Sequence, residues 1–165
     1  MLVSRTACRA PFRSGAAPRR ALAVRATAAP ASTAQLKSLL DDASAAGLGQ
    51  VRFIVLGDGA ILESVNNWGG VRYNDVPSRG TLATIASADK SFECHIVLNK
   101  VKKALIAKSK AKAGDYDVYA IRFQGEEGKM LLTCLLHGQA GVYQPAAVEA
   151  WKKLHEKYGD ALDFA

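Results

Sequence analysis

The side chains of residues 27–165 that are best suited to bind a metal or an anionic group are three histidines and four arginines. Imidazole is the commonest metal ligand, and the planar guanidinium group pairs with carboxylates and phosphates. No two of the histidines have the close spacing of a HExxH metal site. His95 and His137 are expected to project from strands, whereas His155 should flank the packing surface of a helix. His95 and His137 are therefore the candidates for a shared cavity.

The stretch SFECHIVL (91–98) alternates as a half-buried strand does, because successive side chains of a strand point to opposite faces. One face should pack into the core, with Phe92, Cys94, Ile96 and Leu98. The other face carries Glu93, His95 and Val97. This places His95 opposite the core, beside Glu93 two residues back, and it makes His95 the strongest candidate for a ligand.

Two further candidates, Arg72 and Arg79, fall in NNWGGVRYNDVPSRG (66–80), which is rich in glycine and asparagine. This composition predicts a long irregular loop, and long loops often carry function. One interpretation is a binding loop whose arginines hold an anionic ligand. The other, equally supported, is a loop whose Trp68 covers the end of a barrel while the arginines face water.

Two hairpins position these residues. VRFIVLGDGAILESV (51–65) and the stretch 116–136 each join two apolar runs through a short turn bounded by glycines. Further strands are expected at 81–87, 91–98 and 102–107, with an exposed connection at 108–112. Leucines at helical spacing from Leu36, and an apolar stripe that begins after Pro145, predict a helix at each end. The fold class is therefore α+β, with an antiparallel sheet or barrel of about six strands between an N-terminal and a C-terminal helix.

The net charge of +7 comes almost entirely from the first thirty residues, which hold six arginines and no lysine or acid. That composition is typical of an organelle transit peptide, and we expect cleavage near Ala26 and a single domain at 27–165. The expected destination is the chloroplast stroma, and the mitochondrion is the second choice. The alternative is a basic tail that stays attached. The remaining chain is nearly neutral, and its lysine run at 99–114 has no interleaved aromatics, which argues against nucleic-acid binding. No apolar run is long enough to span a membrane.

Cys94 and Cys134 lie in apolar runs without CxxC spacing, so we expect two buried thiols in a reducing compartment and no zinc site. The chain also has no P-loop, nucleophile elbow or dinucleotide fingerprint. No catalytic residue can be named.

The order of motifs resembles the bacterial cytosolic heme-utilisation carriers of the ChuX/HutX type, which are related to each repeat of the HemS-like proteins. The resemblance rests on IVLGDGAILE (54–63), CHIVL (94–98) and the strand–acidic turn–strand at 121–131, and it spans most of residues 50–137. It implies a split β-barrel that forms a homodimer and holds heme on its sheet surface.

In that family a strand histidine contacts the heme, and His95 is the matching position. A second family ligand lies near the first hairpin, where this chain has Leu56-Gly57 and no histidine. That departure would shift a second contact to Tyr73, Tyr143 or His137, since tyrosine and histidine are both accepted axial ligands. Arg72 and Arg79 would then pair with the propionates.

The hypothesis from the sequence is a plastid carrier or buffer for heme or a related tetrapyrrole. The first alternative is a split-barrel oxidoreductase that uses flavin or heme, which bound flavin would reveal by a yellow colour. The second is a regulatory module without a small ligand, which binds another protein through a sheet face or the stretch 66–80. Fold alone does not separate these three.

Overall fold

The structure is a computed structural model that describes residues 33–112 and 114–164. The expected transit peptide, residues 1–26, lies outside the described residues. In chain order the elements are α1 (Thr33–Ala45), β1 (Gln50–Leu56), β2 (Ile61–Asn67), β3 (Val71–Val76), β4 (Gly80–Ala86), β5 (Glu93–Val97), the 3₁₀ turn η1 (Leu98–Lys100), β6 (Lys103–Lys110), β7 (Asp117–Gln124), the 3₁₀ turn η2 (Glu126–Gly128), β8 (Met130–Leu136), α2 (Pro145–Tyr158) and β9 (Ala161–Asp163).

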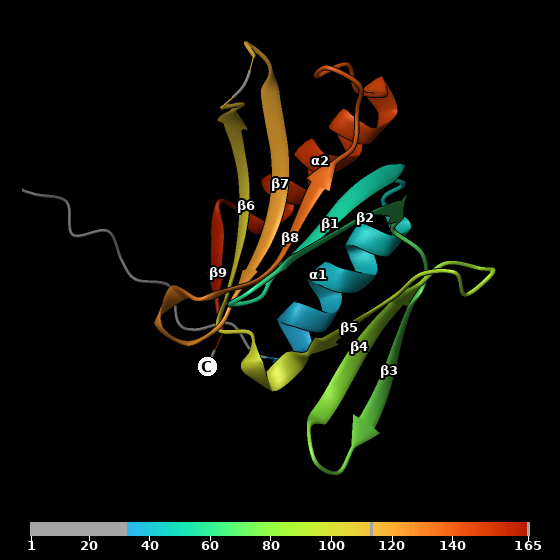
Figure 1. Cartoon of the computed structure of the whole chain (residues 1–165), viewed down its shortest axis with the longest axis vertical. Helices are drawn as coiled ribbons and strands as arrows, with labels where there is room; N and C mark the ends of the chain where they lie inside the picture. Colours follow the sequence, from blue (N-terminus) through green and yellow to red (C-terminus); the bar gives the residue numbers. More distant parts are fainter. Residues whose placement is uncertain (1–32, 113, 165) are drawn as a thin grey trace, which may run out of the picture.

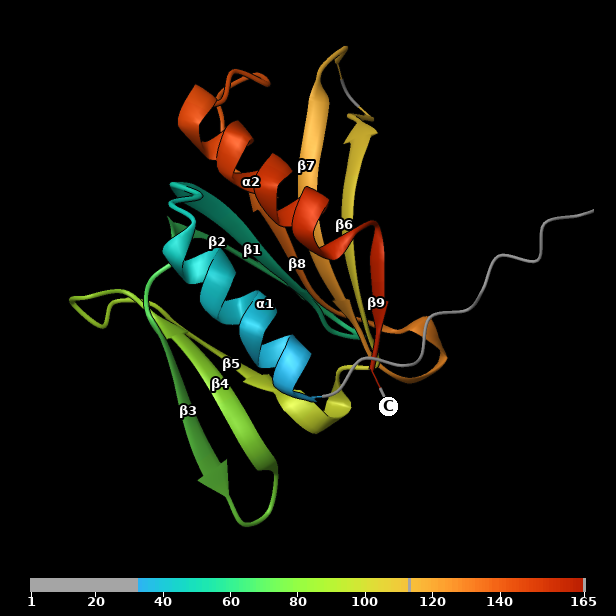
Figure 2. The same cartoon turned by 180° about the vertical axis from the view of Figure 1, so that it is seen from behind.

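The strands form two separate antiparallel sheets (Figure 1). The large sheet has six strands in the order β2-β1-β8-β7-β6-β9, and the small sheet has three in the order β3-β4-β5. Both helices lie on one face of the large sheet, and α1 runs between the two sheets (Figure 2). The predicted α+β class with a helix at each end is confirmed, and the described strands do not close into a barrel.

The elements with the strongest sequence patterns are where they were expected. The second hairpin, β7–β8, spans residues 117–136, which agrees with the predicted stretch 116–136. Helix α1 buries its predicted stripe of Leu36, Leu39, Leu40 and Ala43. Helix α2 begins at Pro145, as predicted, and ends at Tyr158, just before Gly159. No helix among the described residues is long and apolar enough to cross a membrane.

Three expectations were wrong. The stretch 66–80 is not one irregular loop, because its middle forms β3, which pairs with β4 from Val71↔Ile85 to Val76↔Gly80. Strand β6 continues to Lys110, so most of the expected connection at 108–112 is paired with β7. The chain also ends its described part with β9, a short strand that pairs with β6. Nine strands are therefore described where about six were expected.

The core lies between the large sheet and the helices. Phe53 of β1 and Phe123 of β7 are almost fully buried, and Trp151 of α2 packs above the sheet with its Nε1 donating to the carbonyl oxygen of Ala120 at 3.3 Å. The small sheet adds Ala83 and Ile85 of β4 to the same core. The two sheets therefore share one hydrophobic core with α1, and this fixes the position of β5 relative to the large sheet.

Candidate functional site

His95 sits on β5, which is an edge strand of the small sheet. The predicted alternation is confirmed, since Ile96 is buried and Cys94 is partly buried while Glu93 and His95 are exposed. The side chain of His95 is 51% exposed. The strand therefore presents an accessible imidazole on the face opposite the core.

The ladder of the small sheet places a row of polar side chains next to this imidazole. Arg72 of β3 pairs with Thr84 of β4, and Thr84 pairs with His95. Thr84 Oγ1 lies 2.9 Å from His95 Nδ1. Glu93 connects the ends of the row, with Oε2 at 3.6 Å from His95 Nε2 and Oε1 at 3.8 Å from Arg72 Nη2. The structure thus brings together two of the predicted site residues, Arg72 and His95.

A cleft opens beside His95, between β5 and the end of the large sheet where β1 finishes and β8 begins. Its volume is about 270 Å³. It is lined by Cys94, His95, Ile96 and Val97 of β5, Lys100 of η1, Val55 of β1, and Leu131 and Leu132 of β8. Six of these eight lining residues are apolar, and the other two are His95 and Lys100. Such a slot suits a flat apolar molecule that also carries an electron-pair acceptor and a negative charge.

Cys94 also lines the cleft, but burial raises the pKa of its thiol to about 11. The pKa of Cys134, in the core behind it, is raised further by burial and by the neighbouring Cys94. Both cysteines are free thiols. Because a thiolate is the form that attacks electrophiles and binds metals, neither sulfur is a ready ligand near neutral pH.

The other predicted site residues lie elsewhere. Tyr73 belongs to the opposite face of the small sheet, where its hydroxyl group donates to the Lys37 carbonyl oxygen at 3.1 Å and the Asp41 carboxylate at 2.8 Å. Burial, with help from Asp41, raises the pKa of Tyr73. This hydrogen bonding ties β3 to helix α1 and keeps the phenol protonated, so Tyr73 has a structural role and does not line the cleft.

Arg79 lies in the turn between β3 and β4, where its backbone N–H donates to the Val76 carbonyl oxygen at 2.9 Å. His137 follows the last residue of β8 and lies roughly 16 Å along the strand from Leu132, at about 3.3 Å per residue. Neither residue lines the cleft. Tyr143 packs edge-on against Tyr119, with ring centroids 5.4 Å apart. Of the predicted candidates, only His95 lines the cleft, with Arg72 in the adjoining row.

Lys100 and Leu131 are residues of the cleft that sequence reasoning missed. Lys100 belongs to the lysine run at 99–114, and it lines the cleft because η1 turns the chain at the end of β5. Leu131 lies at the irregular start of β8, where the pairing with β7 shifts after Phe123. Neither position has a local sequence signal, since both depend on how the sheets meet.

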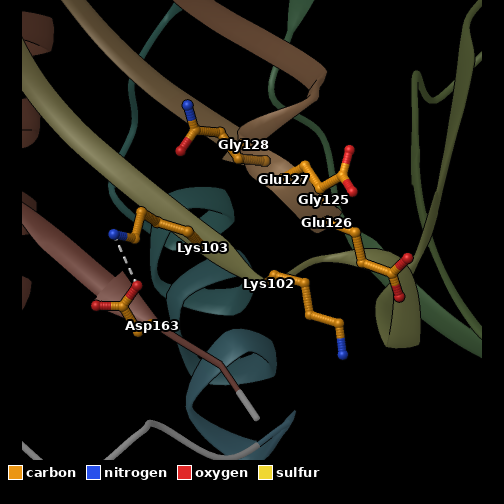
Figure 3. Close-up of a pocket in the computed structure, with 8 residues that line it drawn as sticks. Lys102, Lys103, Gly125, Glu126, Glu127, Gly128 and Asp163 are labelled. Atoms are coloured by element: carbon orange, nitrogen blue, oxygen red, sulfur yellow. Dashed lines mark ion pairs between the residues drawn. The ribbon is translucent and has the colours of Figure 1, made fainter.

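Two other hollows have a different character. One, of about 570 Å³, lies at η2 and is lined by Lys102, Lys103, Gln124, the Gly125–Gly128 turn and Asp163. Figure 3 shows Lys103 and Asp163 pointing toward one another, and their ion pair measures 2.8 Å. The other, of about 560 Å³, lies between the alanine-rich faces of α1 and α2. Within the described residues no cluster of histidine, cysteine and acidic side chains could hold a metal ion by itself.

Solved structures resemble this arrangement of sheets and helices. A structure titled "Structure of the Heme Binding Protein ChuX" matches with a TM-score of 0.60 at 17% identity, over 76% of this chain and 73% of that one. The chain has the fold of the ChuX-type proteins. Apo-PhuS, described as a heme-binding protein from Pseudomonas aeruginosa, matches with a TM-score of 0.58 at 13% identity. ChuS, described as an E. coli heme oxygenase, matches with 0.54 at 17% identity.

The match to PhuS includes 78% of this chain and 34% of the PhuS chain. The match to ChuS includes 76% of this chain and 34% of the ChuS chain. No protein-family model and no curated protein sequence matches the chain. At these identities the structural matches establish the fold.

Proposed function

We propose that the protein is a carrier or buffer for heme or a related tetrapyrrole. The observation that carries the proposal is a cleft that His95 and Lys100 line together with five apolar residues and Cys94. Support also comes from the shared fold, because ChuX and PhuS are described as heme-binding proteins.

The donor set fits a heme. A neutral histidine nitrogen is an accepted axial ligand, the apolar wall suits the macrocycle, and an ammonium group suits a propionate. His95 would bind the iron, Val55, Ile96, Val97, Leu131 and Leu132 would contact the ring, and Lys100 would pair with a carboxylate. A bound heme would supply an iron that accepts an electron pair from the imidazole nitrogen of His95. Arg72 is a second cation within the polar row, although its nearest partner is Glu93.

The size of the cleft favours a carrier. At about 270 Å³ it lies just below the roughly 300–1,000 Å³ of most small-molecule pockets. A tetrapyrrole would be covered in part and would leave one side exposed, so that a second protein could remove it. No group with an evident catalytic role stands in the cleft.

Homodimer formation is part of the proposal, with the partner completing a split barrel. The support is a group of exposed apolar side chains on the first hairpin, where Ile61 and Leu62 are each 65% exposed. Val55, Leu56 and Val65 of the same hairpin are also exposed apolar side chains. Strand β2 is also an edge strand, and apolar edges tend to be covered in native assemblies. Leu62→Lys should reduce a dimer to monomer in analytical ultracentrifugation, and Val142→Lys, at another exposed apolar residue, should not.

The proposed setting is the chloroplast stroma, with the mitochondrion as second choice, on the basis of the six arginines of residues 1–30. Fusion of residues 1–26 to a fluorescent protein tests this placement. A cytosolic signal, or an N-terminus that persists in the protein recovered from the organism, would contradict the transit-peptide assignment.

A heme-dependent oxidoreductase is the second candidate, and the observation in its favour is that ChuS shares the fold and is described as a heme oxygenase. Incubation of the heme complex with a reductant and oxygen separates the two. A heme spectrum that persists supports the carrier, whereas conversion to an open-chain tetrapyrrole spectrum supports the enzyme.

The test of the main proposal is a titration of the full chain with ferric heme, followed in the Soret region. Wild type should show a saturable, near-stoichiometric shift. His95→Ala should weaken it at least tenfold, because the axial ligand is lost. His137→Ala, a histidine outside the cleft, is the matched control and should behave as wild type. A flat or linear response in wild type would exclude heme as the ligand.

A further inference from the structure

Strand β8 has an extra residue at the point where it borders the cleft. Phe123 of β7 pairs with Leu132. The next residue of β7, Gln124, pairs with Met130, so Leu131 is left without a partner on β7. An extra residue of this kind is a β-bulge, which bends its strand and redirects side chains. Successive residues of a regular strand point to opposite faces, yet Leu131 and Leu132 both line the cleft, and the bulge explains how they can.

The side chain of Leu131 packs against the main chain behind it. A Cβ atom built on Gly125 would lie 3.3 Å from both Cδ atoms of Leu131 and 3.1 Å from the Lys100 carbonyl oxygen. Gly125 lines the hollow at η2, whereas Leu131 and Lys100 line the cleft. Leu131 therefore stands between the cleft and that hollow, and it has little room to retreat from a ligand.

The two sides of Leu131 also differ in charge. The cleft is lined by one ammonium group, that of Lys100, and by no carboxylate. The hollow at η2 has one negative charge in excess, because its lining includes Lys102, Lys103, Glu126, Glu127 and Asp163. An anionic ligand is therefore favoured on the cleft side of Leu131 and disfavoured beyond it.

We propose that Leu131 is the end wall of the cleft and limits how deeply a tetrapyrrole enters it. The proposal rests on the proposed function, because it takes a tetrapyrrole as the ligand. A cleft of about 270 Å³ is small for such a molecule, and Leu131 keeps part of the ring outside. A shallow fit shortens the lifetime of the complex, which suits a protein that passes its ligand on. Leu131 is thus a residue that determines ligand size and release.

The first experiment changes the size of the Leu131 side chain in both directions. Leu131→Ala shortens the end wall, and Leu131→Phe extends it. Transfer of heme from the loaded protein to excess apomyoglobin should be slower for Leu131→Ala by about fourfold, the effect of burying one further CH₂ group of the ring. Transfer from Leu131→Phe should be faster than from wild type by a similar factor. Leu135→Ala, at a leucine of the same strand that does not line the cleft, should behave as wild type.

The opposite signs separate an end wall from a general loss of packing. Shortening and enlarging a side chain that only supports the fold are both destabilising, so both would speed the loss of heme. Faster transfer from both variants would therefore overturn the proposal. Unchanged transfer from both, or slower transfer from Leu131→Phe, would overturn it as well.

Alkylation of Cys94 tests the end wall without a porphyrin. Cys94 lines the cleft, and the buried Cys134 reports opening of the whole fold. A bulky maleimide should label Cys94 faster in Leu131→Ala and more slowly in Leu131→Phe than in wild type, with labelling of Cys134 unchanged. Equal changes at both cysteines, or no change at Cys94, would contradict the proposal. Because no porphyrin is present, this measurement separates failure of the end wall from failure of the proposed tetrapyrrole binding.

Discussion

The rings of Phe53 on β1 and Phe92, the residue before β5, lie with centroids 4.8 Å apart and planes tilted by 41°. This contact joins the large sheet to the small sheet directly behind the strand that carries His95. Trp68 extends the contact on the other side of Phe53, at 5.7 Å between centroids. The two walls of the cleft are therefore held together by aromatic packing.

Replacement of Phe92 should weaken this connection. Because Phe92 is only partly buried, we expect Phe92→Ala to lower the free energy of unfolding by about 2 kcal/mol, less than for a fully buried phenylalanine. Urea unfolding followed by circular dichroism measures the loss. Phe92→Leu keeps most of the apolar volume and should lose less than about 1.5 kcal/mol. Equal stability of the alanine variant and wild type would show that the ring contributes nothing to the connection.

Two adjacent glycines, Gly69 and Gly70, lie in the connection between β2 and β3. Alanine substitutions at these two positions form a matched pair that tests how closely this connection packs against the end of β4. A Cβ atom on Gly69 would lie 2.1 Å from the Ala86 carbonyl oxygen, whereas one on Gly70 would meet nothing within 4 Å. Gly69→Ala must shift the backbone, and we expect a loss of about 2–3 kcal/mol. Gly70→Ala should change stability by no more than about 1 kcal/mol. Thermal unfolding of both variants is the measurement, and similar melting temperatures would contradict the close approach at Gly69.

The contact between the helices predicts a dependence of stability on pH. The side chains of Lys157 and Tyr158 on α2 donate hydrogen bonds to Asp42 on α1, and these bonds lower the pKa of Asp42. A lowered pKa in the folded state adds stability that is present above the usual value near 3.8 and is lost as the pH falls below it. Asp42→Asn should therefore cost about 1 kcal/mol at pH 7, since the carboxylate is partly exposed, and nothing near pH 2.

The same contact acts in the other direction at high pH. Burial, followed by the hydrogen bond to Asp42, raises the pKa of Tyr158 to about 12. Its contribution is complete below pH 10 and is lost as the pH rises toward 12. Tyr158→Phe should remove this alkaline loss in urea titrations between pH 9 and pH 12. A variant that loses stability as steeply as wild type would show that Tyr158 does not cause it.

Lys100 gives a prediction about the charge of the ligand. Lys100→Gln should weaken binding of heme by about two- to fivefold, the effect of one exposed ion pair. Binding of the heme dimethyl ester, which has no free carboxylates, should be unchanged. Lys112→Gln, on an exposed lysine away from the cleft, is the control. Equal weakening for heme and for its ester would remove Lys100 from the carboxylate contact.

The cysteines should differ in reactivity. Burial raises the pKa of Cys94 to about 11, and Cys134 is more deeply buried. At pH 8 we expect slow alkylation at Cys94 and much slower alkylation at Cys134, with peptide mass spectrometry separating both from Cys8. Saturation with heme should protect Cys94 further, because it lines the cleft. Faster labelling of Cys134 than of Cys94 would contradict the burial seen here.

The sequence predicted those elements whose pattern is local. The β7–β8 hairpin alternates strongly and turns at glycines, and helix α2 has both a proline start and a glycine end. Strand β3 was missed because Arg72, Asn74 and Asp75 give it a polar, loop-like composition, and it becomes a strand by pairing with β4. The face of His95 could be predicted from alternation within one strand. The positions of its neighbours Thr84 and Lys100 could not be predicted in this way. The register between strands places Thr84 beside His95, and the path of η1 places Lys100 in the cleft.

The small sheet occupies one uninterrupted stretch of the chain, from Val71 to Val97, inserted between two strands of the large sheet. His95 and the three residues of its polar row all belong to that stretch, whereas the large sheet supplies only apolar lining. Substitutions within these 27 consecutive residues could thus change the imidazole and its polar neighbours, while Lys100 of η1 and the remaining architecture stay unchanged. Exchange of this stretch between proteins of the same fold is a direct route to new ligand preferences.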